Sequence, residues 1–205
     1  MSASLTGPMP KSVQPVLTFS QESSKESEIL KATKEEYSHF IGTKGLKQQQ
    51  QDHLNRLQTF ATKREWEHLQ QHTTHLDSGF DWWMFPINEG SAGYTNYYNV
   101  SPEDVTSLRR DTVFMNHYRE GVILVTKSWG WDLEKGKALT SDDKQRWTRY
   151  EVRLKKMLQS LELFDEKVLH DQLINFIESQ KITLGPWLTP WIKRLGSSEE
   201  LGAGK

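Results

Sequence analysis

Three histidines recur at helical spacing in the first half of the chain. His68, His72 and His75 occupy positions i, i+4 and i+7, and the carboxylates of Asp77 and Asp81 follow them. Imidazoles one turn apart lie on the same helix face and can share a metal ion. The segment is nevertheless polar on all sides, and it lacks the glutamate that accompanies the first histidine of helical metalloprotease sites. We therefore expect a solvated helix face and no metal or cofactor, with these histidines as the alternative metal ligands.

A row of basic residues in the C-terminal third is the second candidate, here called the basic stripe. It consists of Arg146, Arg149, Arg153 and Lys156. The spacing i, i+3, i+7 and i+10 would align these side chains along one helix, where they suit phosphate oxygens or an acidic partner. Exposed faces of amphipathic helices are ordinarily charged, however, and Asp143 and Glu151 are close enough in sequence to pair with the stripe. The sequence leaves both interpretations open.

The third candidate is an aromatic-rich stretch in the middle of the chain. It begins at Phe80 and contains Trp82, Trp83 and Phe85, and a glycine-containing loop then leads to Tyr94, Tyr97 and Tyr98. Rigid aromatic rings with polar tips are typical of ligand pockets and protein interfaces. We expect Trp83 and Phe85 in the core. Trp82 and the three tyrosines fit either a core or a binding surface.

Groups for acid–base catalysis are scarce. His117 and Glu120 lie close to Asp111 and Tyr118 in the sequence, but proximity alone does not define a site. The sequence contains no GxSxG elbow, phosphate-binding glycine loop, HExxH motif or dinucleotide fingerprint. The absence of cysteine excludes disulfides, zinc–thiolate sites, iron–sulfur ligation and a thiol nucleophile.

Apolar residues repeat every three or four positions through most of the chain, which predicts the helices that must position these side chains. The predicted helices begin near Ser24, Leu46, Thr62, Ser101, Asp111, Thr140, Asp165 and Gly185. Thr62 to Glu65 has the form of a capping box, and Ser101 precedes a proline and two acids, as an N-cap does. A strand over residues 122–127 is the alternative to the helix that follows Asp111.

Composition sets the class of the protein. Eight tryptophans, eight phenylalanines and six tyrosines compensate for a hydrophobic content of only 35%, because each aromatic side chain buries a large area. We expect an all-α fold, an orthogonal multi-helix bundle of roughly six to eight helices with at most a short β-hairpin near residues 80–100. The domain prediction is a disordered tail over 1–24, one helical domain over 25–195 and a flexible tail over 196–205.

Net charge and hydropathy limit the classes of partner that the sequence predicts. A net charge of −1 supplies no global field to attract nucleic acid or an anionic membrane. The longest apolar run, Val122 to Val125, is far too short to span a bilayer, and the N-terminal residues do not resemble a signal peptide. We expect a soluble, cytoplasmic protein without membrane contacts, in which nucleic acid binding would require the basic stripe.

Two segments resemble a known family. Trp83-Met84-Phe85-Pro86 is similar to the Trp-Leu-Phe-Pro signature of the opioid growth factor receptor conserved region. The segment from Arg153 to Leu161 resembles the Arg-Ile-x-Arg-Ile-Leu-x-Ser-Leu helix of the same region. The similarity covers roughly residues 77–180, and it departs from the family at Gly79 to Trp82 and around Arg149. The resemblance implies an all-helical module and assigns no catalytic residue.

Together these patterns favour a non-enzymatic helical binding or regulatory protein whose partner is another protein. Its contacts would come from the aromatic stretch and the basic stripe. An enzyme acting on a small molecule in an aromatic pocket, with His117 or Glu120 as proton carriers, is one alternative. A nucleic-acid or phosphate binder that uses the basic stripe is the other.

Overall fold

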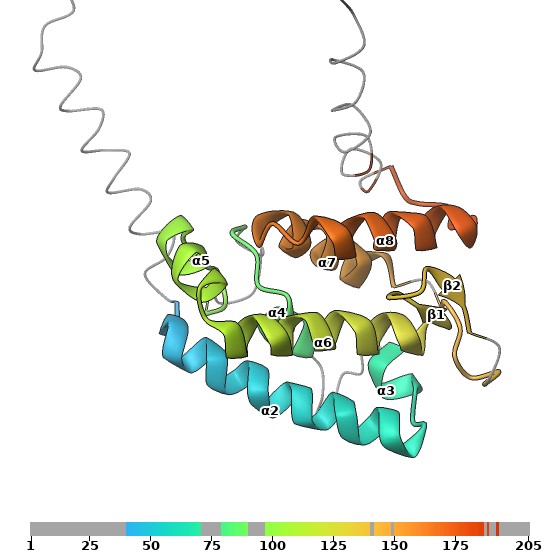
Figure 1. Ribbon diagram of the computed structural model, residues 1–205, viewed down its shortest axis with the longest axis horizontal. Coiled ribbons are helices and arrows are strands. Elements are labelled where there is room, and N and C mark those ends of the chain that lie inside the picture. Colours follow the sequence, from blue (N-terminus) through green and yellow to red (C-terminus); the bar gives the residue numbers. More distant parts are fainter. Residues whose placement is uncertain are drawn as a thin grey trace, which may run out of the picture. The chain divides into compact units, whose positions relative to one another are not determined.

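The computed structural model describes residues 40–70, 79–89, 97–139, 142–148, 150–186, 188 and 192. The predicted tails, and all but the end of the helix predicted from Ser24, lie outside these ranges. Within them the chain is mostly helical, which confirms the all-α prediction (Figure 1). The helices are α2 (Gly42–Lys63), α3 (Glu67–Gln70), α4 (Phe80–Met84), α5 (Pro102–Arg109), α6 (Thr112–Ser128), α7 (Glu151–Leu163) and α8 (Lys167–Ser179).

The described residues contain one two-stranded antiparallel sheet. Strand β1 (Trp131–Asp132) pairs with β2 (Lys137–Ala138), with Trp131 opposite Ala138. This sheet directly follows α6 instead of lying near residues 80–100, the region to which the sequence analysis assigned a hairpin.

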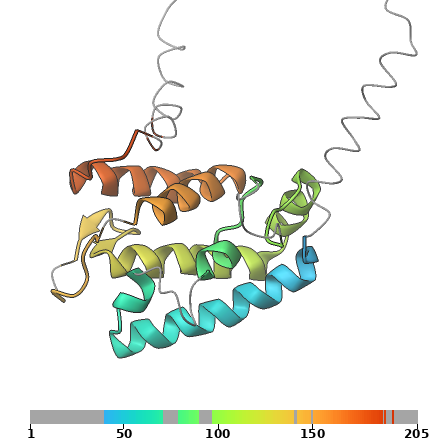
Figure 2. The same cartoon turned by 180° about the vertical axis from the view of Figure 1, so that it is seen from behind.

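Helix α6 lies at the centre of the arrangement. It packs against α2, α3, α5 and β1. Figures 1 and 2 show α2 running along one side of α6, with α7 and α8 on the opposite side. None of the helices described is long and apolar enough to span a lipid bilayer.

Aromatic rings fill the space between α6 and the two C-terminal helices. At one end Tyr118 and Phe164 pack with their centroids 5.2 Å apart, and at the other Trp129 and Phe176 stack at 5.7 Å. All four side chains are at most 2% exposed. Large rings thus supply the core area that the low apolar content would otherwise lack.

The helix starts predicted at Ser101 and Asp111 are confirmed. Ser101 Oγ accepts a hydrogen bond from the Asp104 N–H at 3.2 Å, and the Asp104 carboxylate accepts one from the Ser101 N–H at 3.1 Å, which completes a capping box. The Asp111 carboxylate caps α6 through the Phe114 N–H at 3.0 Å. Residues 122–127 are helical, because Val122 and Val125 bury completely on the inner face of α6.

Two other predicted starts, and the predicted cap of α8, are wrong. Helix α2 continues through Thr62 to Lys63, and the Thr62 hydroxyl donates to the Gln58 carbonyl instead of capping. Helix α7 begins at Glu151 and not near Thr140, because residues 142–148 follow a non-helical path. Asp165 does not cap α8; it adopts a left-handed φ of 58° in the turn between α7 and α8.

Candidate functional site

A proline sets the end of α4 and the direction of the segment that follows. Pro86 disfavours helical geometry at Phe85, which has φ −126° and ψ 67°. The Val100 N–H donates to the Ile87 carbonyl at 3.2 Å, so the segments 85–87 and 97–100 lie side by side. Phe85 is fully buried and Trp83 half-buried, with Trp83 packed against the core.

An ion pair fixes α4 to α7. Lys156 Nζ lies 2.9 Å from a carboxylate oxygen of Asp81, and both side chains are 5% exposed. The Lys156 ammonium also lies over the Trp82 ring, in a cation–π contact. Burial lowers the pKa of Lys156 to about 8, although the charge of Asp81 and its hydrogen bond act in the opposite direction.

Arg153, one turn earlier on α7, is buried as well. Its guanidinium lies 4.2 Å from the Phe80 ring centroid and donates a 2.6 Å hydrogen bond to the Leu69 carbonyl. Burial lowers the pKa of Arg153, against the favourable charge of Asp81. The guanidinium therefore connects α7 to α4 and α3 from the inside.

These positions correct the expectation of an exposed basic stripe. Arg153 and Lys156 are each 4% exposed and point into the protein. Arg146 is exposed in the segment before α7, and Arg149 lies outside the described residues. The four cations therefore do not form one surface row, because α7 is covered on the side that bears Arg153 and Lys156.

Aromatic rings from α4 and from residues 97–98 form one cluster. The Trp82 and Tyr98 rings stack with centroids 4.2 Å apart, and Trp83 meets Tyr98 edge-on at 6.0 Å. Tyr98 is 5% exposed and belongs to the core, whereas both indoles are half-buried. Tyr94 lies outside the described residues.

Next to this cluster two large hydrophobic side chains are exposed. Tyr97 is 47% exposed and Ile41 43% exposed. The Ile41 N–H donates to the Tyr97 carbonyl at 3.0 Å, so the two residues are neighbours. We call Ile41, Trp82, Trp83 and Tyr97 together the aromatic surface.

Of the histidine row, His68 alone lies within the described residues. His68 stacks on Phe60 with ring centroids 4.4 Å apart, and His72 and His75 lie outside the described residues. Among the residues described, no group of three or more His, Asp or Glu side chains is arranged to hold a metal ion.

The acid–base candidates lie on α6 and at its N-cap. Glu120 accepts a 2.7 Å hydrogen bond from the Gln58 amide of α2, and Asp111 pairs with Lys47 at 2.9 Å. The Tyr118 hydroxyl is buried in the aromatic core, and desolvation raises its pKa far above the usual value. In the described part of the chain no hydrogen bond or ion pair joins His117 to Glu120.

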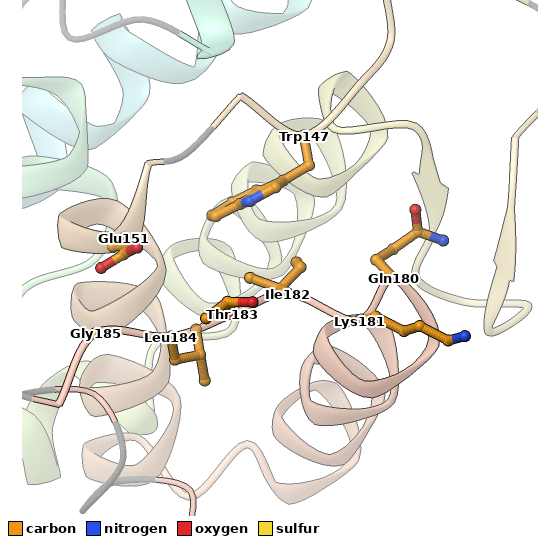
Figure 3. Close-up of a pocket in the computed structure, with 8 residues that line it drawn as sticks. All are labelled: Trp147, Glu151, Gln180, Lys181, Ile182, Thr183, Leu184 and Gly185. Carbon is orange, nitrogen blue, oxygen red and sulfur yellow. The ribbon is translucent and has the colours of Figure 1, made fainter.

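A cleft of about 500 Å³ lies elsewhere, between the start of α7 and the segment that follows α8 (Figure 3). It is lined by Trp147, Glu151 and residues Gln180 to Gly185. Trp147 lies in the irregular segment before α7. Only the alternation of polar and aliphatic residues after α8 distinguishes residues 180–185 in the sequence.

Comparisons with protein-family models, curated proteins and solved structures give no match to this chain. The resemblance to the opioid growth factor receptor conserved region therefore stays a prediction.

Proposed function

We propose that this chain is a non-enzymatic protein-binding module that holds a partner protein at the aromatic surface. The observation that carries the proposal is the mounting of Trp82: one face of its indole stacks on buried Tyr98, and the buried Lys156 ammonium also contacts its ring. A ring held in this way loses little conformational entropy when a partner covers its exposed portion.

The composition of the surface supports this proposal. Tryptophan and tyrosine are enriched among the residues that dominate binding energy at protein interfaces. Tyr97 and Ile41 add exposed apolar area beside the two half-buried indoles. The Lys155–Glu89 ion pair, with an N–O distance of 3.8 Å, places charged groups next to α4, as in the polar rim of an interface.

The structural roles of Glu120 and of the two inner cations favour binding over catalysis. Glu120 is hydrogen-bonded to Gln58 of α2, and the two inner cations of the basic stripe are enclosed by protein. Structural contacts therefore account for the positions of these residues, without a role in an acid–base pair or in an exposed phosphate-binding row.

The test is capture of a partner by the purified chain with and without Tyr97. Tyr97→Ala removes exposed aromatic area without disturbing the core, so we expect a specific partner to be lost at least tenfold. Val168→Ala is the matched control, because Val168 is a 75% exposed apolar residue of α8.

A partner identified in this way is then titrated against the purified variants. Trp83→Ala is expected to weaken the complex as Tyr97→Ala does, with thermal melting used to confirm that each variant is folded. Equal retention by the Tyr97→Ala variant and the wild type, or loss on Val168→Ala alone, would contradict the proposal.

A further inference from the structure

The wall of the cleft at Trp147 is built by a well-defined turn at the end of α8. The Lys181 N–H donates to the Glu178 carbonyl at 3.1 Å, and the Ile182 N–H donates to the Ile177 carbonyl at 3.0 Å. These two bonds form a Schellman motif, in which Lys181 adopts a left-handed φ of 48°. The turn redirects the chain, so that residues 182–185 line the cleft opposite Trp147 and Glu151 (Figure 3).

Three apolar side chains line the cleft and are continuous with the core. Trp147, Ile182 and Leu184 are half-buried and pack against the hydrophobic core. Trp147 meets Trp129 edge-on with centroids 4.9 Å apart, and it meets Phe176 edge-on at 5.8 Å. These contacts fix the indole, so the apolar lining is formed before any ligand enters.

The charged groups of the cleft are unequally placed. Figure 3 shows Glu151 at one end of the cleft and Lys181 at the other, with the Lys181 ammonium directed away from the indole. Glu151 is the acidic residue among those that line the cleft. It belongs to the first turn of α7, where the helix dipole stabilises a negative side chain.

We propose that this cleft binds a small organic cation with an apolar body. The indole of Trp147 offers a ring face to the apolar body and to the positive charge, and the Glu151 carboxylate neutralises that charge. A volume of about 500 Å³ falls within the range that small-molecule sites occupy. The site is separate from the aromatic surface, so the proposal does not depend on the proposed function.

The test uses three probes of similar size: phenethylammonium, benzyltrimethylammonium and the neutral phenethyl alcohol. Binding to the full chain is followed by calorimetry and by the Trp147 indole N–H resonance, assigned with Trp147→Phe. Both cations should bind and shift that resonance, and the alcohol should bind at least tenfold more weakly, because it lacks the charge that Glu151 recognises.

Two substitutions locate the recognition. Glu151→Gln should weaken both cations by roughly tenfold, while Glu178→Gln, an equal loss of charge on an exposed part of α8, should leave binding unchanged. Lys181→Gly retains the turn and removes the positive lining group, so it should not weaken the binding of either cation.

Three outcomes would overturn the inference. They are equal binding of the alcohol and the cations, equal effects of Glu151→Gln and Glu178→Gln, and absence of binding by all three probes to the folded wild type. Loss of cation binding on Lys181→Gly comparable to the loss on Glu151→Gln would also contradict the assignment, because removal of a positive charge should not weaken the binding of a cation.

Discussion

Lys156 donates a hydrogen bond to Asp81 across 2.9 Å, and the two residues, on different helices, are 75 positions apart in the sequence. Both are almost completely removed from solvent. Such a pair has a high desolvation cost that the partners' attraction and the cation–π contact with Trp82 must offset. The pair therefore specifies where α4 packs on α7, and this in turn positions the indole of the aromatic surface.

Removing one member of the pair should cost far more than removing both. Asp81→Asn leaves Lys156 and Arg153 buried without their carboxylate, and we expect a loss of about 3–5 kcal/mol in the free energy of unfolding. Asp81→Leu combined with Lys156→Met should recover most of that loss, because no buried charge of the pair remains. Urea unfolding of the single and double variants measures the coupling free energy between Asp81 and Lys156. Strictly additive losses in the free energy of unfolding would contradict the prediction.

The stability contribution of Lys156 should depend on pH in the alkaline range. Its pKa in the folded chain, about 8, lies below the value of 10.5 for an unperturbed lysine. Between these two values the unfolded chain binds the proton that the folded chain has released, so stability rises with pH. Relative to Lys156→Met, the wild type should gain free energy of unfolding from pH 8 to 10.5 and show no further change below pH 8.

His170 should make the fold sensitive to acid. Its side chain is 3% exposed, and desolvation lowers its pKa from the usual 6.5 despite the nearby charges of Asp171 and Glu162. The unfolded chain then takes up a proton below pH 6.5 that the folded chain resists, so stability decreases as the pH falls. His170→Leu should flatten this decrease in melts at a series of pH values. An unchanged slope would show that other groups cause it.

Gly130 should tolerate no side chain. It has a φ of +81°, and a Cβ at this position would lie 2.5 Å from the Gln145 carbonyl oxygen. Gly42, with φ +83° and nothing within 4 Å, provides a control that isolates the backbone strain. Gly42→Ala should cost about 1–2 kcal/mol, and Gly130→Ala should cost about 1–3 kcal/mol more in denaturant unfolding, because of the clash.

Lys181→Gly should stabilise the protein. The left-handed conformation of Lys181 disfavours any residue with a Cβ, while glycine adopts it freely. We expect a gain of up to about 1 kcal/mol, reduced by the greater freedom of glycine in the unfolded chain. Thermal unfolding measures the gain. A lower melting temperature would show that packing of the lysine stem outweighs the backbone strain at this position.

Two helix starts were predicted correctly from signals that involve only neighbouring residues. The Ser101 capping box and the Asp111 cap need only residues within one turn, and the structure contains both. Thr62 carries an equally good motif, but packing of Leu54 and Leu57 extends α2 past it. A local motif therefore fails where buried apolar residues hold the preceding helix in place.

The position of the basic residues could not be read from one helix alone. Charge ordinarily indicates exposure, and Arg153 and Lys156 are buried only because Asp81, Phe80 and Trp82 meet them from a distant segment. The cleft was not predicted from the sequence, for a similar reason. Trp147 comes from an irregular segment, and its partners Ile182 and Leu184 follow α8, so no periodicity connects them.

Trp147 connects the cleft to the aromatic core. Its ring edge belongs to the same aromatic packing as Trp129 and Phe176, and the residue also lines the cleft. Occupancy of the cleft and cooperative melting of α6 and α8 are then thermodynamically linked, and a bound molecule raises the transition temperature in proportion to the logarithm of its concentration. A thermal shift screen of amines would therefore detect a ligand through the core, even where the ligand causes no visible change of shape.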